Sequence, residues 1–157
     1  MAAVDVVDEY LEQLPGQSRR LAHGEWGVTV ESDQAGGRPL HVGVTLSEGV
    51  LRAKAHALDS PDGIDPWMLL WWNRQTRMAR FGCTREREVW VHADLPAAAV
   101  DAAEVDRLLG LVVEGAIAVR EYQRSRTEPA TEAGAGWLSG GAGSAPQAAR
   151  SRSRSAR

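Results

Sequence analysis

Histidine, aspartate and cysteine are the residues of this sequence that could do chemistry, and they are few. The 157-residue chain has four histidines and one cysteine, Cys83. His41 and His56 lie on two alternating segments, and His92 and Asp94 lie on another. Two histidines and one such neighbour could offer a metal three ligands, but a zinc site needs three or four ligands in tetrahedral geometry. An ordinary polar pair is the better interpretation, so we expect no metal site.

Cys83 would need a base within hydrogen-bond reach to act as a nucleophile. Alternation along the predicted strands turns Cys83 inward and His92 outward, and side chains on opposite faces of a sheet cannot form a dyad. We therefore expect Cys83 to be a small buried apolar residue. A single cysteine also excludes an intrachain disulfide and a multi-cysteine metal site. With no glycine-rich phosphate loop either, the sequence predicts no catalytic residues, no cofactor and no enzymatic activity.

Composition and charge describe an ordinary globular chain with a basic end. Apolar residues make up 43 % and charged residues 25 % of the chain, whose formal net charge is −3. Residues 125–157 hold five arginines and two glutamates, so they carry +3 and residues 1–124 carry −6. An acidic body repels nucleic-acid phosphates, so nucleic-acid binding would have to come from the basic end.

The longest apolar run, residues 67–72, is far shorter than the roughly 20 residues of a transmembrane helix. The acidic start of the chain has no signal-peptide pattern. We therefore expect a cytoplasmic protein without a membrane span.

The spacing of apolar residues predicts the elements that must position these side chains. Helical spacing predicts helices over residues 3–14, 66–77 and 101–124, and strict alternation predicts strands near residues 26–30, 40–46, 51–57, 79–83 and 89–95. The order is α-β-β-β-α-β-β-α, with no long crossover inside the runs of strands. We therefore expect an α+β fold, with an antiparallel sheet and helices packed on it.

Two pairings between predicted strands are specific enough to test. A two-residue turn at Glu48-Gly49 pairs inward residues with inward residues, Val44 with Ala53 for example, and places His41 opposite His56. In the last two strands Gly82 lies opposite Trp90, whose ring can cover the bare backbone.

Composition changes sharply near Arg124. The residues beyond it are rich in Gly, Ala, Ser and Arg and lack the apolar side chains that would offset the entropy of ordering them. We expect one α+β domain over residues 1–124 and a disordered tail over residues 125–157. Trp137 and Leu138 are the only large apolar pair of this tail, and they are either a short docking motif or incidental.

The predicted middle helix is apolar over most of its circumference. Trp67, Leu70 and Trp71 occupy one side, and further apolar residues continue the arc. A helix on one sheet needs an apolar arc of about 100°, and this arc is about twice as wide. Either another helix of the same chain covers the surplus, or it is a homodimer interface or a client groove. The residues we assign to such a partner or dimer surface are Trp72, Met68, Leu69 and Trp90.

The element order and three stretches, residues 65–73, 80–82 and 88–96, carry a resemblance to a known family. Over residues 3–124 the chain resembles the YbjN-like proteins, which share the fold of type III secretion chaperones. The resemblance implies a compact α+β domain, commonly dimeric, which in the chaperone branch binds an extended segment of another protein. In the YbjN branch it implies a regulator, and it supplies no catalytic residues to carry over.

We therefore expect a non-enzymatic protein-binding module, chaperone-like or an adaptor or regulator. It would act as a homodimer on a protein or peptide partner. The alternative is a regulatory protein that contacts nucleic acid through its basic Arg/Ser tail.

Overall fold

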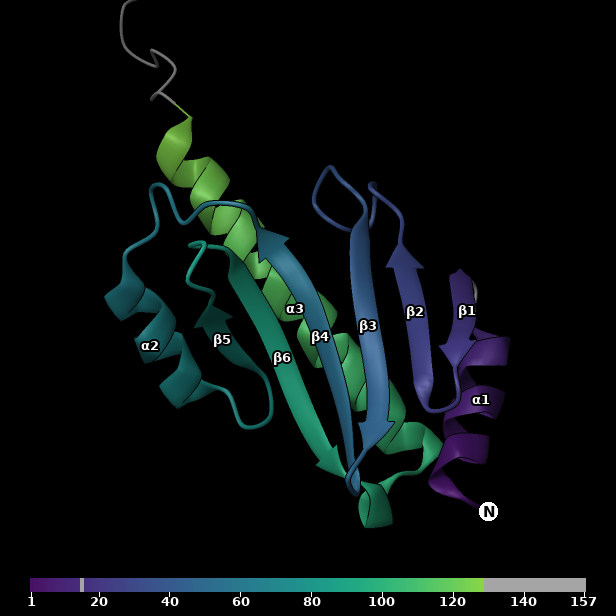
Figure 1. Cartoon of the computed structure of the whole chain (residues 1–157). Coiled ribbons are helices and arrows are strands. Elements are labelled where there is room, and N and C mark those ends of the chain that lie inside the picture. The colour runs from purple at the N-terminus through teal and green to yellow at the C-terminus, as the bar shows by residue number, and fades with distance from the viewer. Residues whose placement is uncertain (15, 129–157) are drawn as a thin grey trace, which may run out of the picture.

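The computed structural model describes residues 1–14 and 16–128 and has one antiparallel sheet with helices beside it and behind it (Figure 1). The sheet has six strands in the order β1-β2-β3-β4-β6-β5. The elements in chain order are α1 Ala3–Gln13, β1 Gln17–Ala22, β2 Glu25–Val30, β3 Leu40–Ser47, β4 Val50–Leu58, α2 Pro66–Gln75, β5 Arg80–Cys83, β6 Val89–Pro96, the 3₁₀ helix η1 Ala97–Ala99, and α3 Ala102–Thr127. The α+β class and the predicted order are confirmed, with one additional strand, β1.

β1 was not predicted from the sequence, because it is an edge strand whose side chains are mostly exposed. Such a strand needs no alternation of apolar and polar residues, and alternation is the signal by which a strand is recognised. It pairs with β2 through backbone hydrogen bonds, with Gln17 opposite Thr29. The structure confirms the predicted pairings of Val44 with Ala53 and of Gly82 with Trp90.

α3 packs against one face of the sheet, where it contacts β3, β4 and β6. In Figure 1 it crosses behind the strands, and the face toward the viewer carries no helix. Asp101 caps its start by accepting a hydrogen bond from the Glu104 N–H. α3 continues to Thr127, so its last turn includes residues predicted to belong to the tail. The rest of the predicted tail, residues 129–157 with Trp137 and Leu138, lies outside the described residues.

α1 packs against β1 and α3 at the β1 edge of the sheet. The Tyr10 hydroxyl donates a 2.6 Å hydrogen bond to Asp106 of α3. Burial, together with this carboxylate, raises the pKa of Tyr10 to about 12. Asp8 accepts from the Trp26 indole at 2.7 Å and pairs with Arg20 at 2.8 Å, so α1 is attached to both β1 and β2.

Cys83 was predicted to be buried, and this was wrong, because it is exposed. It pairs with Val89, which is fully buried. However, Cys83 is the last residue of the edge strand β5, which has a neighbouring strand on one side only. Alternation predicts which face a side chain takes, but the burial of that face depends on what covers it.

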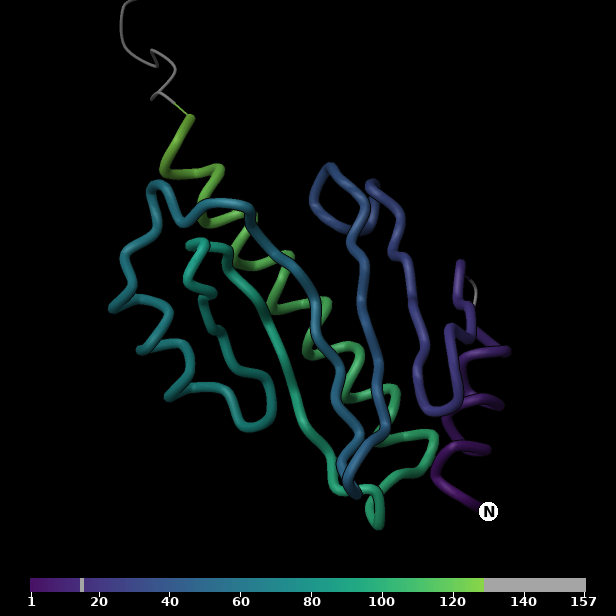
Figure 2. The backbone as a smooth tube through the Cα atoms, in the orientation of Figure 1, coloured from purple at the N-terminus to yellow at the C-terminus, as the bar shows by residue number. Residues whose placement is uncertain are grey.

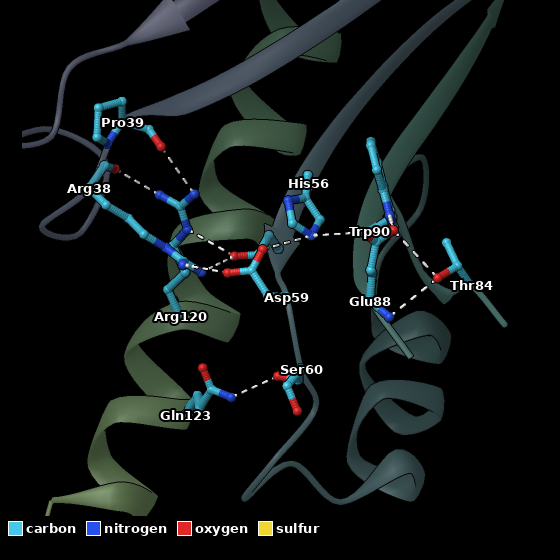
Figure 3. A network of polar contacts seen from close by, with 11 residues as sticks. Arg38, Pro39, His56, Asp59, Ser60, Thr84, Glu88, Trp90, Arg120 and Gln123 are labelled. Atoms are coloured by element: carbon cyan, nitrogen blue, oxygen red, sulfur yellow. Dashed lines mark hydrogen bonds and ion pairs between the residues drawn. The ribbon is translucent and has the colours of Figure 1, made fainter. Parts of the chain in front are cut away.

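Arg120 of α3 is a buried charged residue, only 7 % exposed, and it connects three parts of the fold. Its guanidinium donates to the carbonyl oxygens of Ala57 at the end of β4 and of Ala35, Arg38 and Pro39 in the β2–β3 connection, at 2.7–3.3 Å. Figure 3 shows the bonds to Arg38 and Pro39. Burial lowers the pKa of Arg120. The backbone acceptors satisfy the charge and fix the loop against α3.

We expect Arg120→Met to lower the free energy of unfolding by about 3 kcal/mol or more, because it leaves several buried carbonyl groups without a donor. Equilibrium urea denaturation measures this difference. Arg107→Met is the control, because Arg107 forms an exposed ion pair with Glu104 and its loss should cost at most about 1 kcal/mol. Equal losses in the two variants would contradict the structural role of Arg120.

Two glycines of α3 should respond differently to alanine. A Cβ at Gly115 would lie 3.1 Å from Cγ1 of the fully buried Val91, whereas a Cβ at Gly110 would meet nothing within 4 Å. We expect Gly110→Ala to stabilise the fold by up to about 1 kcal/mol, as alanine does in helices. Gly115→Ala should fail to stabilise it, because the close contact with the sheet offsets this gain. Thermal unfolding distinguishes them, and equal stabilisation would show that α3 is not closely packed at Gly115.

Candidate functional site

α2 is a short helix with defined ends. The Asp65 carboxylate accepts a 3.0 Å hydrogen bond from the Trp67 N–H, and Pro66 occupies the first helical position, where a missing N–H costs nothing. The helix ends at Gln75, two residues before the predicted end, and Thr76 bonds back to the Trp72 carbonyl. The chain therefore holds α2 in a helical conformation although the helix buries none of its ten residues.

The side of α2 that faces away from the sheet is apolar and uncovered. Trp67 is 76 % exposed, Leu70 57 % and Trp71 55 %. In Figure 1 α2 lies beside the edge strand β5 instead of across the sheet, so the fold covers only one side of it. The prediction that the apolar arc exceeds what the fold covers is confirmed for the described residues.

The structure exposes different residues from those assigned to this surface by sequence. Trp72 is half-buried, and its ring centroid lies 5.4 Å from those of Phe81 and Tyr122. Met68 and Leu69 are also half-buried. The assignment of Trp72, Met68 and Leu69 to a partner surface stays a prediction. The structure shows that Trp72 turns partly inward, because its ring packs on the aromatic rings of β5 and α3.

Trp90 does not join the α2 residues. It lies on the open face of the sheet, where its ring packs on His56 with centroids 5.0 Å apart. Its indole N–H donates to Glu88 at 3.0 Å. Trp90 was expected to cover the bare backbone of Gly82, but a Cβ added at Gly82 would instead be nearest to the His92 ring, at 3.7 Å.

A groove of about 380 Å³ continues the exposed face of α2 toward α3. Its lining is mostly apolar and comprises Trp71, Trp72, Ala79, Phe81, Leu111 and Ala118, with Gln75 and Glu114 among its polar residues. We call this groove, together with Trp67, Leu70 and Trp71, the α2 surface. The contribution of Leu111 and Ala118 was not predicted, because no local pattern indicates that α3 passes beside α2.

Asn73 attaches α2 to the free edge of β5. Its side-chain amide donates to the Phe81 carbonyl at 2.9 Å and accepts from the Phe81 N–H at 2.7 Å. The amide thus makes the two bonds that a neighbouring strand would make. An edge strand with unpaired backbone groups is open to pairing with other chains, and Asn73 closes β5 at this position.

Polar contacts fix the connection from β4 to α2, which Figure 2 traces from the end of β4 past the last turns of α3. Gln123 of α3 donates to the carbonyls of Ser60 at 2.8 Å and Asp62 at 2.9 Å. Asp59 pairs with Arg38 at 3.1 Å (Figure 3). The start of α2 is therefore held by α3 and by the β2–β3 connection.

His56 lies between two carboxylates in the same region. Its Nε2 atom is 3.6 Å from Asp59 and 3.9 Å from Glu88, and the atom is buried without a hydrogen-bond partner (Figure 3). His41 does not pair with His56, because the contacts of β3 with β4 end at Val42 and Ala55. The His41 ring instead contacts the Thr29 hydroxyl at 3.1 Å.

The structure does not bring the candidate chemical residues together. Arg52 binds Asp94 through two bonds of 2.6 and 2.8 Å, and this pairing lowers the pKa of Asp94. Among residues 1–14 and 16–128, no group of three or more His, Cys, Asp or Glu side chains has a geometry that could hold a metal ion.

No helix in this part of the chain is long and apolar enough to cross a membrane.

We expect Asn73→Leu to loosen α2 from the sheet, because leucine fills a similar volume but cannot bond to either backbone group of Phe81. Hydrogen exchange should show the Phe81 amide exchanging at least tenfold faster, while the Val91 amide in the sheet centre stays protected. Arg74→Leu is the control on the same helix, because Arg74 is exposed. Unchanged exchange at Phe81 in Asn73→Leu would contradict the role of Asn73 in attaching α2 to β5.

One family model matches part of the chain. Residues 63–122, from the start of α2 into α3, match the family model of YbjN, described as "Putative bacterial sensory transduction regulator". No curated protein matches the sequence.

Solved structures match most of the chain. The Yersinia pestis type III secretion chaperone SycH, solved with a stable fragment of YscM2, has a TM-score of 0.56 at 14 % identity, over 74 % of this chain and 98 % of its own. The chaperone–effector complex HopA1–SchA contains a chain with a TM-score of 0.57 at 13 % identity, over 74 % and 91 %. YbjN from E. coli, described as "a putative transcription regulator", has a TM-score of 0.54 at 12 % identity, over 78 % of this chain and 91 % of its own. Residues 63–122 thus resemble the YbjN family, and the fold of the chain is that of the type III secretion chaperones.

Proposed function

We propose that this chain is a non-enzymatic, chaperone-like or adaptor module that binds protein and acts in the cytoplasm as a homodimer through the α2 surface. The observation that carries the proposal is the uncovered apolar side of α2, with Trp67 and Trp71 both more than half exposed. Large exposed apolar patches are rare on monomeric proteins and are typical of interaction sites.

The chemistry of the α2 surface suits a strong interface. Tryptophan is among the residues that contribute most binding free energy, because its large rigid ring buries much apolar area at little entropic cost. The groove beside Trp71 gives a partner's aromatic or aliphatic side chain a place to insert. Asn73 and Asp65 hold the helix in place, so little ordering is needed on binding.

A second copy of the same chain is the partner that the charges favour. Arg74 and Arg77 are exposed on and just after α2, and Glu114 is exposed beside the groove on α3. In a two-fold symmetric dimer the same patch faces itself, so a cation from one copy can meet a carboxylate from the other. Such a patch with both signs is self-complementary.

The comparisons support a protein partner as well. The SycH structure contains a fragment of another protein, and the HopA1–SchA structure is a chaperone–effector complex. We propose that this chain likewise holds a segment of another protein.

Sedimentation velocity of the full chain tests the homodimer. We expect Trp71→Glu to weaken self-association at least 100-fold, because each substitution occurs twice in a symmetric dimer and buries an unpaired charge. Arg19→Gln is the matched control, since it changes the charge by the same amount at the opposite edge of the sheet and should weaken association less than fivefold.

Circular dichroism of both variants checks the fold, which Trp71→Glu should preserve because Trp71 is more than half exposed. A wild-type chain that sediments as a monomer at all concentrations would refute the homodimer. Equal weakening in Trp71→Glu and Arg19→Gln would place the interface elsewhere.

A further inference from the structure

Two glycines lie directly opposite each other in the sheet, Gly27 on β2 and Gly43 on β3. Both face the side that carries no helix, since their neighbours Trp26 and Val42 are buried on the other side. Glycine weakens a strand, and a positive φ that would require glycine occurs at neither position. The backbone conformation therefore does not explain this pair.

Packing within the chain does not explain the pair either. A Cβ added at Gly27 would meet nothing nearer than the Leu21 side chain at 3.7 Å, and one at Gly43 nothing nearer than the Lys54 side chain at 3.7 Å. These are ordinary contact distances, so larger residues would fit. A glycine in a strand often marks a place where a ligand or another backbone approaches closely.

A hollow of about 670 Å³ lies over the two glycines. We call it the glycine hollow, and the residues of its lining that matter here are Arg19, Leu21, Gly27, Thr29, His41 and Gly43. It belongs to the open face of the β1, β2 and β3 end of the sheet, whereas α2 lies beside β5 at the opposite edge (Figure 1). The hollow and the α2 surface are therefore separate.

Two basic side chains lie on opposite sides of the glycine pair. The strand register puts Arg19, Gly27, Gly43 and Lys54 in one row across four strands. Arg19 side-chain atoms lie 3.9 Å from the Cβ position of Gly27, and the Lys54 Cε lies 3.7 Å from that of Gly43. Within the described part of the chain, neither Arg19 nor Lys54 forms an ion pair.

Other basic side chains of the same face are engaged. Arg52 forms the two-bond pair with Asp94, and Arg80 donates to backbone carbonyls of the α2–β5 connection. The Lys54 ammonium lies 6.0 Å from the Trp90 ring, at the outer limit of a cation–π contact. Arg19 and Lys54 are therefore available to an anionic partner.

We propose that the glycine hollow binds an extended, acidic segment of a protein partner. The segment's backbone lies against the glycines, and its carboxylates pair with Arg19 and Lys54. The chain as a whole has a net charge of −3, so these two cations are a local exception that selects an acidic segment. This inference rests on the proposed protein-binding role but not on dimerisation through α2.

The spacing of the strands fits such a segment. β1 and β4 are three strand intervals apart, which is about 14 Å. An extended peptide rises about 3.4 Å per residue and presents every second side chain on the same face. Carboxylates four residues apart on the segment, about 14 Å, would therefore reach Arg19 and Lys54 together.

Fluorescence anisotropy of the full chain with a labelled twelve-residue peptide of alternating glutamate and threonine tests the proposal. We expect saturable binding at low salt that weakens as salt is added, and no binding of the corresponding lysine–threonine peptide. Lys54→Glu and Arg19→Glu should each weaken binding at least tenfold. Arg107→Glu makes the same charge change on α3, away from the hollow, and should change affinity less than twofold.

A second pair of variants fills the hollow without changing charge. Gly27→Val and Gly43→Val should preserve or raise the melting temperature, because valine favours strands and the sites have room for it. Both should weaken peptide binding at least tenfold, because the valine side chains would occupy the space above the two glycines. Unchanged binding in these variants would mean that the glycines have no part in recognition and would overturn the proposal.

Two further outcomes would overturn it. One is that the wild-type chain does not bind the acidic peptide. The other is tighter binding of a twelve-nucleotide oligothymidylate at the same residues, which would make phosphates the ligand. Sedimentation of the same samples separates this inference from the proposed homodimer. Trp71→Glu should lower the mass and keep peptide affinity, whereas Lys54→Glu should do the reverse.

Discussion

The packing of α3 against one face of the sheet is the constraint on which the rest of this structure depends. Its buried residues recur at helical spacing from Val105 to Val119, and Gly115 lets the helix approach Val91 closely. Arg120 then joins the last part of α3 to the β2–β3 connection and to the end of β4. Because α3 occupies this face, the short α2 lies beside β5 and cannot bury its whole apolar circumference.

This arrangement leaves two surfaces of different chemistry. The α2 surface is apolar and is held rigidly by Asp65 and Asn73, which suits a partner that contributes aromatic or aliphatic side chains. The open face of the sheet is polar, with a basic border around two bare glycines. A module with two separate surfaces can associate with itself through one and hold a partner through the other.

The low identity to structures of the same fold fits this division. At 12–14 % identity, what persists is the overall fold. A fold tolerates extensive exchange of apolar residues if volume and pattern are kept. Function therefore has to be argued from the side chains of this chain's own surfaces, which here are Trp67 and Trp71 on one side and Arg19 and Lys54 on the other.

The sequence by itself determined the α+β class, the three α-helices, the strands other than β1 and the pairing of Val44 with Ala53. Helical spacing, alternation and turn chemistry are local properties of a chain. It also indicated that the middle helix has a surplus of apolar residues. Only the tertiary structure decided that Trp72 turns inward toward Tyr122 while Trp71 stays exposed, and that Cys83 is uncovered. The reason is physical: a pattern gives the face to which a side chain belongs, whereas burial depends on a neighbour that arrives from a distant part of the chain.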